Sequence, residues 1–451
     1  MKRRQFISTV GLGVGAYSIF PNIGMSWEGI PSRKGKIISG RKLNIACVGI
    51  GGRGQDDIKG LAHENIMALC DVNKGAEQKK TIDKFPEAKV YTDYRKMLLE
   101  MDEQIDAVLV ATPDHMHFPI AMMAMQMGKH VYVEKPIAHT VEEARIMTRV
   151  AREKNIISQC GNQGHAGEGV RNCVEWVRAG VIGNITEVHA WTNRPLTSGY
   201  YKWYQGVEKP TEAEPVPSEL DWNLWLGVAP YRDYHSHYVP KKWRGWWDFG
   251  GCALGDMGCH ILDGSFWALD LKYPVSVEVD QKGATKESGP LESTIIYSFP
   301  TRNAMPPVKV FWYDGGRKPP VPVGLEKDKG LGNNGFYMVG DKGVILSDGD
   351  YCQSPQLVPQ TAMKEFLAHR PEKTIARVPN GNQFVEWTKA CKGEGPMPGS
   401  NFDYSGPLSE MILMGNLAVR INKKIEWDGP NMICTNLPEV NQLVKKNYRA
   451  F

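Results

Sequence analysis

The feature that most restricts the fold of this chain is an alternation of short apolar runs with helical patterns over residues 41–160. The runs read LNIACVGI, IMALCDVN, DAVLVATPD, KHVYVEKP and NIISQC. Helix-like stretches separate them, and one begins at Thr140 with Glu143 three residues later, which is a capping-box signature. Strands that alternate with helices predict an α/β domain with a doubly wound parallel sheet.

The second part of the chain, residues 161–451, has a different pattern. Turn residues, prolines and aromatics become dense, and strand-like runs such as TEVHAWTN, VSVEVDQ, STIIYSF, VKVFWY, GFYMVG and GVILS follow one another. A helical pattern, PLSEMILMGNLAVRIN, comes near the C-terminus. This order predicts an α+β domain with a large open mixed or antiparallel sheet.

Residues 1–40 predict an export signal followed by a linker. The start, M-K-R-R-Q-F-I-S, precedes an uncharged, mildly apolar run, and the adjacent Arg3 and Arg4 resemble a twin-arginine signal. No small hydroxyl residue precedes the arginines, and no A-x-A cleavage site follows them. Despite these two departures, the paired arginines and the apolar run predict a periplasmic or otherwise exported protein without a membrane span in the mature chain. A disordered basic tail on a cytoplasmic protein is the alternative.

Composition removes several classes of function. The net charge is +4, and Lys2, Arg3 and Arg4 contribute three of these charges, so the rest of the chain is close to neutral. A chain so balanced gives no electrostatic reason to expect a nucleic-acid partner. The nine cysteines are too few and too scattered for a disulfide scaffold, and the absence of a C-x-x-C pair argues against a zinc ribbon or a thioredoxin-like motif.

The first apolar run ends in a glycine-rich hexamer, Gly49 to Gly54, that matches G-x-G-x-x-G and precedes a helical pattern. Asp71 follows 22 residues after Gly49, at the end of the second run, where an acid that binds ribose hydroxyls is expected. This predicts a dinucleotide site with NAD favoured over NADP, although the basic Arg53 and Lys74 leave NADP open. The expected contacts here are Gly49, Gly51, Gly52, Arg53 and Asp71.

A second stretch, G-D-M-G-C-H-I-L-D at 255–263, places Asp256, His260 and Asp263 at spacings of four and three. On a helix these three side chains would share one face. Such a group can perform acid–base chemistry, supply two metal ligands, or cap and solvate a helix end. The nine residues alone leave these possibilities open.

Taken together, G-I-G-G-R-G, A-T-P-D-H-M-H (111–117), V-E-K-P (133–136) and G-D-M-G-C-H (255–260) resemble the Gfo/Idh/MocA oxidoreductase family from about Lys42 onward. The resemblance implies an N-terminal Rossmann domain and a second domain whose open sheet often forms a homo-oligomer interface. It also implies that Lys135 lies between nicotinamide and substrate, with Asp256 and His260 supplied by the second domain.

The chemistry of alcohol oxidation assigns roles to these catalytic candidates. His260 would accept the hydroxyl proton, since the ordinary pKa of histidine is near neutrality. Asp256 would orient the imidazole, and Lys135 would stabilise negative charge on the alcohol oxygen. Glu134 would orient the nicotinamide ribose or the lysine, and Asp263 has a capping or supporting role. A metal is not expected.

Further residues are expected around the same site. The cofactor candidates that follow the third, fourth and fifth runs are Thr112, Pro113, Asp114, His117, Glu134, Lys135 and Asn162. The substrate candidates are His165, Arg171, Tyr234, His235 and His237. Seven of the 13 tryptophans fall within residues 191–247, which suits either stacking on sugar rings or core packing under loops.

The function these observations favour is an NAD-dependent oxidoreductase that moves hydride between a tightly bound cofactor and a secondary hydroxyl of a sugar, glycoside or cyclitol. One alternative is a related NAD-dependent glycosidase that acts by transient C3 oxidation and elimination. That branch departs from the E-K-P lysine, which is present here as Lys135. The other is a non-catalytic sugar- or nucleotide-binding protein, in which loss of the lysine or histidine would be expected.

Overall fold

The computed structural model describes residues 30–199, 202–326 and 329–451. Most of the predicted export signal therefore lies outside the described residues. The segment predicted as its linker is extended and hydrogen-bonded at residues 33–38: the backbone N–H groups of Arg33, Gly35 and Ile38 donate to carbonyls of Gln126, Lys154 and Cys391. These three bonds hold the segment along the first domain.

The first domain is built on a six-stranded parallel sheet of order β3-β2-β1-β4-β5-β6. The order reverses between β1 and β4, and ligands of doubly wound sheets bind at this crevice, beyond the carboxyl ends of the strands. The predicted parallel sheet is thus confirmed; the short β3 was not expected. The strands are β1 (Asn44–Val48), β2 (Asn65–Cys70), β3 (Lys89–Tyr91), β4 (Ala107–Val110), β5 (His130–Val133) and β6 (Ser158–Cys160).

Helices pack against this sheet, and the capping box predicted at α5 is present. The Thr140 hydroxyl accepts from the Glu143 N–H at 3.3 Å, and the Glu143 carboxylate accepts from the Thr140 N–H at 3.0 Å. The helices are α1 (Arg53–Gly60), α2 (Ala76–Ile82), α3 (Tyr94–Glu100), α4 (His117–Gln126) and α5 (Val141–Glu153).

A helix from the far end of the chain, α11 (Gln383–Cys391), completes this domain. Its Phe384 stacks on Tyr132 of β5 with ring centroids 5.2 Å apart, and its fully buried Trp387 meets the same ring edge-on. Both belong to a core cluster that includes Leu43 and Ile45. The core of the first domain therefore includes side chains from beyond residue 160.

The mixed sheet predicted for the second domain is present. It has nine strands, in the order β13-β12-β11-β7-β10-β9-β8-β14-β15. Within the described part of this second sheet, only β7 and β10 pair in parallel, and all its other strand pairs are antiparallel. The strands are β7 (Ile185–Trp191), β8 (Ser276–Lys282), β9 (Glu292–Phe299), β10 (Val308–Asp314), β11 (Gly335–Gly340), β12 (Gly343–Asp348), β13 (Gln356–Val358), β14 (Ile425–Asp428) and β15 (Ile433–Cys434).

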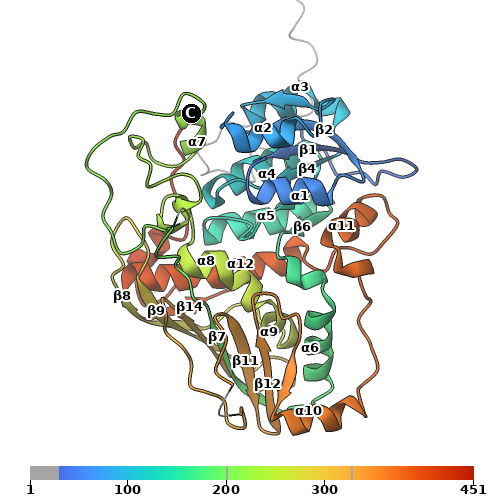
Figure 1. Cartoon of the computed structure of the whole chain (residues 1–451), viewed down its shortest axis with the longest axis vertical. Helices are drawn as coiled ribbons and strands as arrows, with labels where there is room; N and C mark the ends of the chain where they lie inside the picture. Colours follow the sequence, from blue (N-terminus) through green and yellow to red (C-terminus); the bar gives the residue numbers. More distant parts are fainter. Residues whose placement is uncertain (1–29, 200–201, 327–328) are drawn as a thin grey trace, which may run out of the picture.

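A layer of helices joins the two sheets (Figure 1). The long α12 (Phe402–Ile421) contacts α5 of the first domain, and α8 (Cys252–Ile261) and β8 of the second. The motif of residues 255–263 is helical, but α8 ends at Ile261 and Asp263 begins α9 (Asp263–Ala268). Other helices of this domain are α6 (Glu168–Arg178), α7 (Trp222–Leu226) and α10 (Gln360–Leu367).

Two global properties follow from the described chain. All nine cysteines are buried free thiols, so none forms a disulfide bond within the chain. Among residues 30–199, 202–326 and 329–451, no helix has the length and hydropathy needed to cross a membrane.

Candidate active site

The glycine-rich turn after β1 is the first element of the site. Gly49 has a φ of 82°, and a Cβ there would lie 2.5 Å from the carbonyl oxygen of Ala111. A Cβ on Gly54 would lie 1.9 Å from the oxygen of Gly49. Any larger residue would push β1 away from α1, so these glycines hold the strand-to-helix turn close enough for the backbone to meet a pyrophosphate.

Asp71 ends the second strand beside this turn. Its carboxylate accepts the N–H of Ile50 at 2.9 Å and the N–H of Asn73 at 2.9 Å, which fixes both loops. Burial raises the pKa of Asp71, and these backbone donors oppose the rise. Gln78 and the backbone of Gly51 act on the carboxylate in the same sense, so ribose hydroxyls would compete with these donors for its oxygens.

Arg53 is occupied elsewhere, which weakens the case for a 2′-phosphate. One of its terminal nitrogens lies 2.7 Å from Asp57 Oδ1, and its Nε lies 3.4 Å from Glu134 Oε1. The N–H of Gly52 donates to Glu77 Oε1 at 3.0 Å, so a bound pyrophosphate would compete with this carboxylate for the donor. Acidic groups thus surround the ribose end of the site, which favours NAD over NADP.

A cavity of about 370 Å³ runs from the glycine turn to helix α8. It is lined at one end by Gly49 and Asp71 and at the other by Lys135 and His260, so it connects the predicted cofactor residues to the predicted catalytic residues. The other predicted residues that line it are Gly51, Gly52, Arg53, Thr112, Pro113, Asp114, His117, Glu134 and Asp256.

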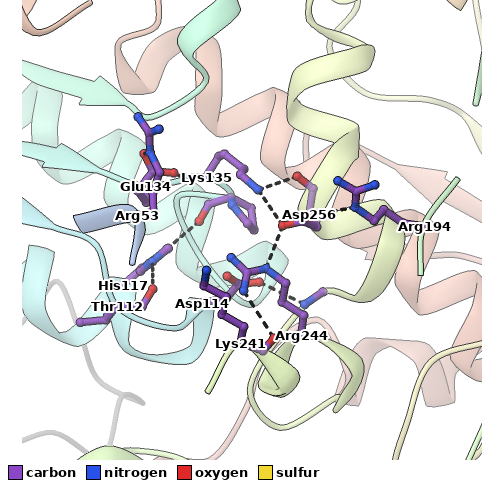
Figure 2. Close-up of polar contacts among 12 residues, drawn as sticks. Arg53, Thr112, Asp114, His117, Glu134, Lys135, Arg194, Lys241, Arg244 and Asp256 are labelled. Carbon is purple, nitrogen blue, oxygen red and sulfur yellow. Dashed lines mark hydrogen bonds and ion pairs between the residues drawn. The ribbon is translucent and has the colours of Figure 1, made fainter. Parts of the chain in front are cut away.

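The centre of the catalytic end is a carboxylate shared by cations from both domains (Figure 2). Lys135, which follows β5, donates from Nζ to Asp256 Oδ1 at 3.0 Å and to the Asp256 carbonyl at 2.5 Å. Arg244 donates from Nε to the same Oδ1 at 2.9 Å, and Arg194 Nε lies 4.0 Å from Oδ2. Burial alone would raise the pKa of Asp256, but Lys135 and Arg244 outweigh it and hold the pKa well below its usual range.

His260 lies one helical turn after Asp256. It is buried, and its Nδ1 has no hydrogen-bond partner among the described residues. Burial, reinforced by the charge of Lys135, holds the pKa of His260 well below its ordinary value, so the imidazole is neutral near pH 7. The carboxylate of Asp256 binds Lys135 and Arg244, which differs from its expected role of orienting the imidazole.

Two side chains after β4 fix the adjoining loops. Asp114 accepts the N–H of Gly251 at 3.1 Å, and burial raises the pKa of Asp114 to about 7. His117 places Nδ1 2.8 Å from the carbonyl of Pro136 and Nε2 2.8 Å from that of Thr112. The ring therefore connects the loop after β4 to the loop that carries Lys135 (Figure 2).

Several predicted residues lie away from the cavity. His165 is buried, with Nδ1 2.9 Å from Asp263 Oδ1, and the same oxygen accepts the Tyr404 hydroxyl at 2.6 Å. Asp263 thus supports a buried polar cluster. Arg171 donates to backbone carbonyls of Ala376 and His165, and Asn162 bonds Ser400.

The remaining substrate candidates lie in the loop region of residues 203–249. Tyr234 belongs to a buried aromatic cluster with Trp222, Trp225 and Trp246, so these tryptophans serve core packing. His235 and His237 line a separate depression, where His237 stacks on Tyr204 at 3.7 Å. They do not join Asp256 and His260, and no group of three or more His, Cys, Asp or Glu side chains in the described chain is placed to hold a metal.

Sequence reasoning missed Arg194, Arg244 and Tyr351, all of which line the cavity. Arg194 comes shortly after β7, and Arg244 lies in the short helical turn Lys242–Gly245. Tyr351 follows β12, and its ring meets that of His260 edge-on at 4.9 Å. The position of Arg194 just after a strand was the one available signal; no spacing linked the other two to α8.

The ribose end is closed by a seam between the domains, formed by residues 72–74 and 219–221. The N–H of Lys74 donates to the Glu219 carbonyl at 2.9 Å, and that of Asp221 donates to the Val72 carbonyl at 2.9 Å. Leu220 of the seam lines the cavity, as do Leu224 and Trp225 of α7.

The end of the chain lies against this seam, beside α7 (Figure 1). Arg449 donates to Asn223 Oδ1 at 2.7 Å and to the Ala229 carbonyl at 3.0 Å. Phe451 lines the cavity, with the Arg95 guanidinium 4.2 Å from its ring centroid. Both domains and the C-terminal segment therefore enclose the cavity at its ribose end.

Comparison with known families agrees with this geometry. The oxidoreductase family model for the NAD-binding Rossmann fold matches residues 43–162, and the model for its C-terminal alpha/beta domain matches residues 167–299. Together they cover more than half of the chain. The chain belongs to the Gfo/Idh/MocA oxidoreductase family. Its first domain is an NAD-binding Rossmann domain.

Curated relatives match parts of the chain. It is 27% identical over 206 residues to inositol 2-dehydrogenase of Salmonella typhimurium, covering 44% of this chain and 59% of that protein. It is 32% identical over 172 residues to levoglucosan dehydrogenase of Pseudarthrobacter phenanthrenivorans, covering 38% and 34%. It is 39% identical over 121 residues to alpha-N-acetylgalactosaminidase of Tannerella forsythia, covering 24% and 25%. Each match spans less than two thirds of the relative.

Solved structures share the fold over more of the chain. The WlbA dehydrogenase from Bordetella pertussis, in complex with NADH and UDP-GlcNAcA, has a TM-score of 0.59 at 17% identity, covering 86% of this chain and 99% of that one. A levoglucosan dehydrogenase in complex with NADH and L-sorbose has a TM-score of 0.55 at 16% identity, covering 86% and 100%.

The shared carboxylate predicts the behaviour of Lys135. Burial disfavours its charge, yet Asp256 outweighs burial and raises the pKa of Lys135. In Asp256→Asn, only Glu134 still opposes burial and the nearby Arg244, so we expect the pKa of Lys135 to fall by about 2 pH units or more. Carbon NMR of ¹³C-dimethylated lysines, assigned with Lys135→Arg, measures it.

Asp350→Asn, which removes another carboxylate that lines the cavity, is the matched control. If both variants leave the titration of Lys135 where the wild type has it, Asp256 does not hold the charge of this lysine.

Proposed function

We propose that this protein is an NAD-dependent oxidoreductase that transfers hydride between a tightly held nicotinamide cofactor and a secondary hydroxyl of a sugar, glycoside or cyclitol. The observation that carries the proposal is the convergence of Lys135 and His260 at one end of a cavity whose other end is the glycine turn. The printed names of its relatives, inositol 2-dehydrogenase and levoglucosan dehydrogenase, support this substrate class.

When bound, NAD supplies the hydride acceptor, and the protein supplies the proton chemistry. A protonated lysine has three N–H donors. Lys135 uses two of them on Asp256, so one remains for the substrate oxygen, where it stabilises developing negative charge. His260 is neutral near pH 7 and accepts the hydroxyl proton. Asp256 keeps the lysine charged and in place.

The cofactor would be held by Gly49, Gly51 and Asp71 on the first domain. Leu220 and Phe451, from the seam and the C-terminal segment, cover the same cavity. Release of the dinucleotide then requires the seam to open. Such an enclosure supports a cofactor that stays bound between turnovers and is regenerated in place by a second substrate.

A second candidate is the redox-neutral glycosidase. The 39% identity to alpha-N-acetylgalactosaminidase of Tannerella forsythia favours it, although the match covers only 25% of that protein. Transient oxidation at C3 would acidify the C2 proton and release the aglycone. In this chain Lys135 and His260 would serve the oxidation step of either reaction, so the products distinguish the two functions. The presence of Lys135, from which the glycosidase branch departs, favours the oxidoreductase.

The experiment that tests the function starts with protein purified without added nucleotide. The bound cofactor is extracted and identified, and a panel of sugars, glycosides and inositols is then added while the absorbance of reduced nicotinamide is followed. We expect reduction by one sugar class in the wild type, and a loss of about 10²- to 10⁴-fold in rate in Lys135→Ala and in His260→Ala. The exposed Lys309→Ala and His369→Ala are matched controls.

The dependence of activity on pH is a further test of the role of His260. Protonation of His260 abolishes its action as a base, so activity is lost as the pH falls through its pKa, and that loss lies well below pH 6.5.

Release of an aglycone without net reduction would move the function to the glycosidase. Absence of nucleotide, with no binding when it is supplied, contradicts both functions.

Retention of the cofactor is tested by its rate of release. Phe451→Ala removes an aromatic wall of the cavity while leaving the backbone bond to Arg95 possible. Loss of a half-buried aromatic contact of about 1–2 kcal/mol corresponds to release of NAD roughly tenfold faster. Fluorescence during displacement by excess dinucleotide measures the rate. Tyr231→Ala, at a residue 66% exposed, is the control; equal rates in both variants would remove Phe451 from this role.

We also propose that the protein is exported to the periplasm by a twin-arginine signal. The support is the run M-K-R-R-Q-F-I followed by an uncharged apolar stretch. Replacement of Arg3 and Arg4 by lysine is expected to leave most of the protein in the cytoplasm, whereas Lys2→Gln is not. Cell fractionation with immunodetection measures the distribution, and equal export of all three forms would reject the signal.

A further inference from the structure

The catalytic end of the cavity holds more cationic than anionic groups. Lys135, Arg244 and Arg194 all surround the single carboxylate of Asp256, at 3.0, 2.9 and 4.0 Å. Figure 2 shows the three side chains approaching it from different sides. Proton transfer needs only Lys135 and His260. Arg244 acts on it only through Asp256, and Arg194 has no part in the chemistry described above.

Neighbouring carboxyl groups do not offset this excess. Asp114 is buried, its pKa is raised to about 7, and it accepts the Gly251 N–H, so it contributes only part of a charge near neutral pH. Glu134 is paired with Arg53. Asp350 also lines the cavity, but with Asp256 it makes two carboxylates for three cations.

Both guanidinium groups are held in place with donors to spare. Arg244 uses Nε on Asp256 and Nη1 on the Lys241 carbonyl at 3.4 Å, and it stacks 4.3 Å from the Trp243 ring centroid. Arg194 uses Nη1 on Asn193 Oδ1. In the part of the chain that the structure describes, no protein acceptor is found for Nη2 of either arginine, and both line the cavity.

The chemistry of these groups selects an anion. A guanidinium presents its N–H donors in a planar fork that matches a carboxylate or a phosphate and gives charge-assisted bonds. The hydroxyls of a neutral sugar would satisfy some donors but would leave the excess charge uncompensated at a half-buried site. An anionic group on the substrate would accept hydrogen bonds from these donors and would also compensate the excess positive charge.

We propose that the substrate is an acidic sugar, whose carboxylate or phosphate is bound by Arg194 and Arg244 beside the catalytic lysine. The inference rests on the proposed oxidoreductase function and specifies its substrate class. Both arginines come from the second domain, Arg194 from the segment after β7 and Arg244 from the turn before α8. They are specificity residues, and the hydroxyl to be oxidised is presented to Lys135 and His260.

The test compares sugars that differ only in their charged group, using the protein with its cofactor bound. Glucuronate is paired with glucose and galacturonate with galactose, and the 6-phosphates of both sugars separate phosphate from carboxylate recognition. We expect the acidic member to be preferred in kcat/KM by about tenfold to a hundredfold. Titration calorimetry of the same pairs measures binding even where no turnover occurs.

Arg194→Gln is expected to remove most of that preference, mainly through the KM of the acid, and Arg194→Lys to restore part of it. Arg317→Gln is the matched control because Arg317 has the same 22% side-chain exposure and is also ion-paired, but follows strand β10 outside the cavity. Its acid preference should equal that of the wild type.

Each outcome bears on a different claim. Reduction of bound NAD by neutral sugars with no advantage for their acids, in kinetics and in calorimetry, overturns the acidic substrate and leaves the oxidoreductase standing. Binding of acids without reduction by any sugar removes the oxidoreductase and keeps the anion site. An equal loss of acid preference in Arg194→Gln and Arg317→Gln overturns the role of Arg194.

Discussion

The ion pair between Lys135 and Asp256 is the interaction on which the rest of the site depends, because it joins the two domains at the place where chemistry is proposed. Lys135 follows a strand of the Rossmann sheet, and Asp256 lies on α8 of the second domain. The contact fixes the lysine of one domain against α8 of the other, beside His260. Strand β5, helix α8 and the loop fixed by His117 all serve it.

Its energetics explain why it is surrounded by further cations. The side chains of Lys135 and Asp256 are only 11% and 12% exposed, so both charges lose most of their hydration. A buried pair recovers that cost only with good geometry and additional hydrogen bonds. Asp256 obtains them from Arg244, and Lys135 obtains one from the backbone carbonyl of Asp256 itself. The same arrangement leaves the lysine charged beside a neutral imidazole.

Local features of the fold and the site were predictable from the sequence because each of them is determined by contiguous residues. The glycine turn, Asp71, the E-K-P lysine and the Asp256–His260 pair each depend on a short motif whose geometry a strand end or a helix turn imposes. Residues such as Arg244 and Tyr351 reach the cavity through tertiary packing of loops, which no local spacing encodes. His165 and Arg171 follow β6 and have the chemistry of site residues, yet they form buried bonds to Asp263 and to backbone carbonyls. Residue type alone could not show which polar side chains line the cavity and which form buried bonds away from it.

The attachment of α11 to the first domain also bears on how the chain is made. Phe384 and Trp387 complete the core around Leu43 and Ile45, more than 300 residues earlier. During synthesis, most of the Rossmann sheet leaves the ribosome long before the helix that covers this face of it. The Rossmann domain emerges first, but its core is completed only after most of the second domain has been synthesised. The two domains therefore cannot mature strictly one after the other.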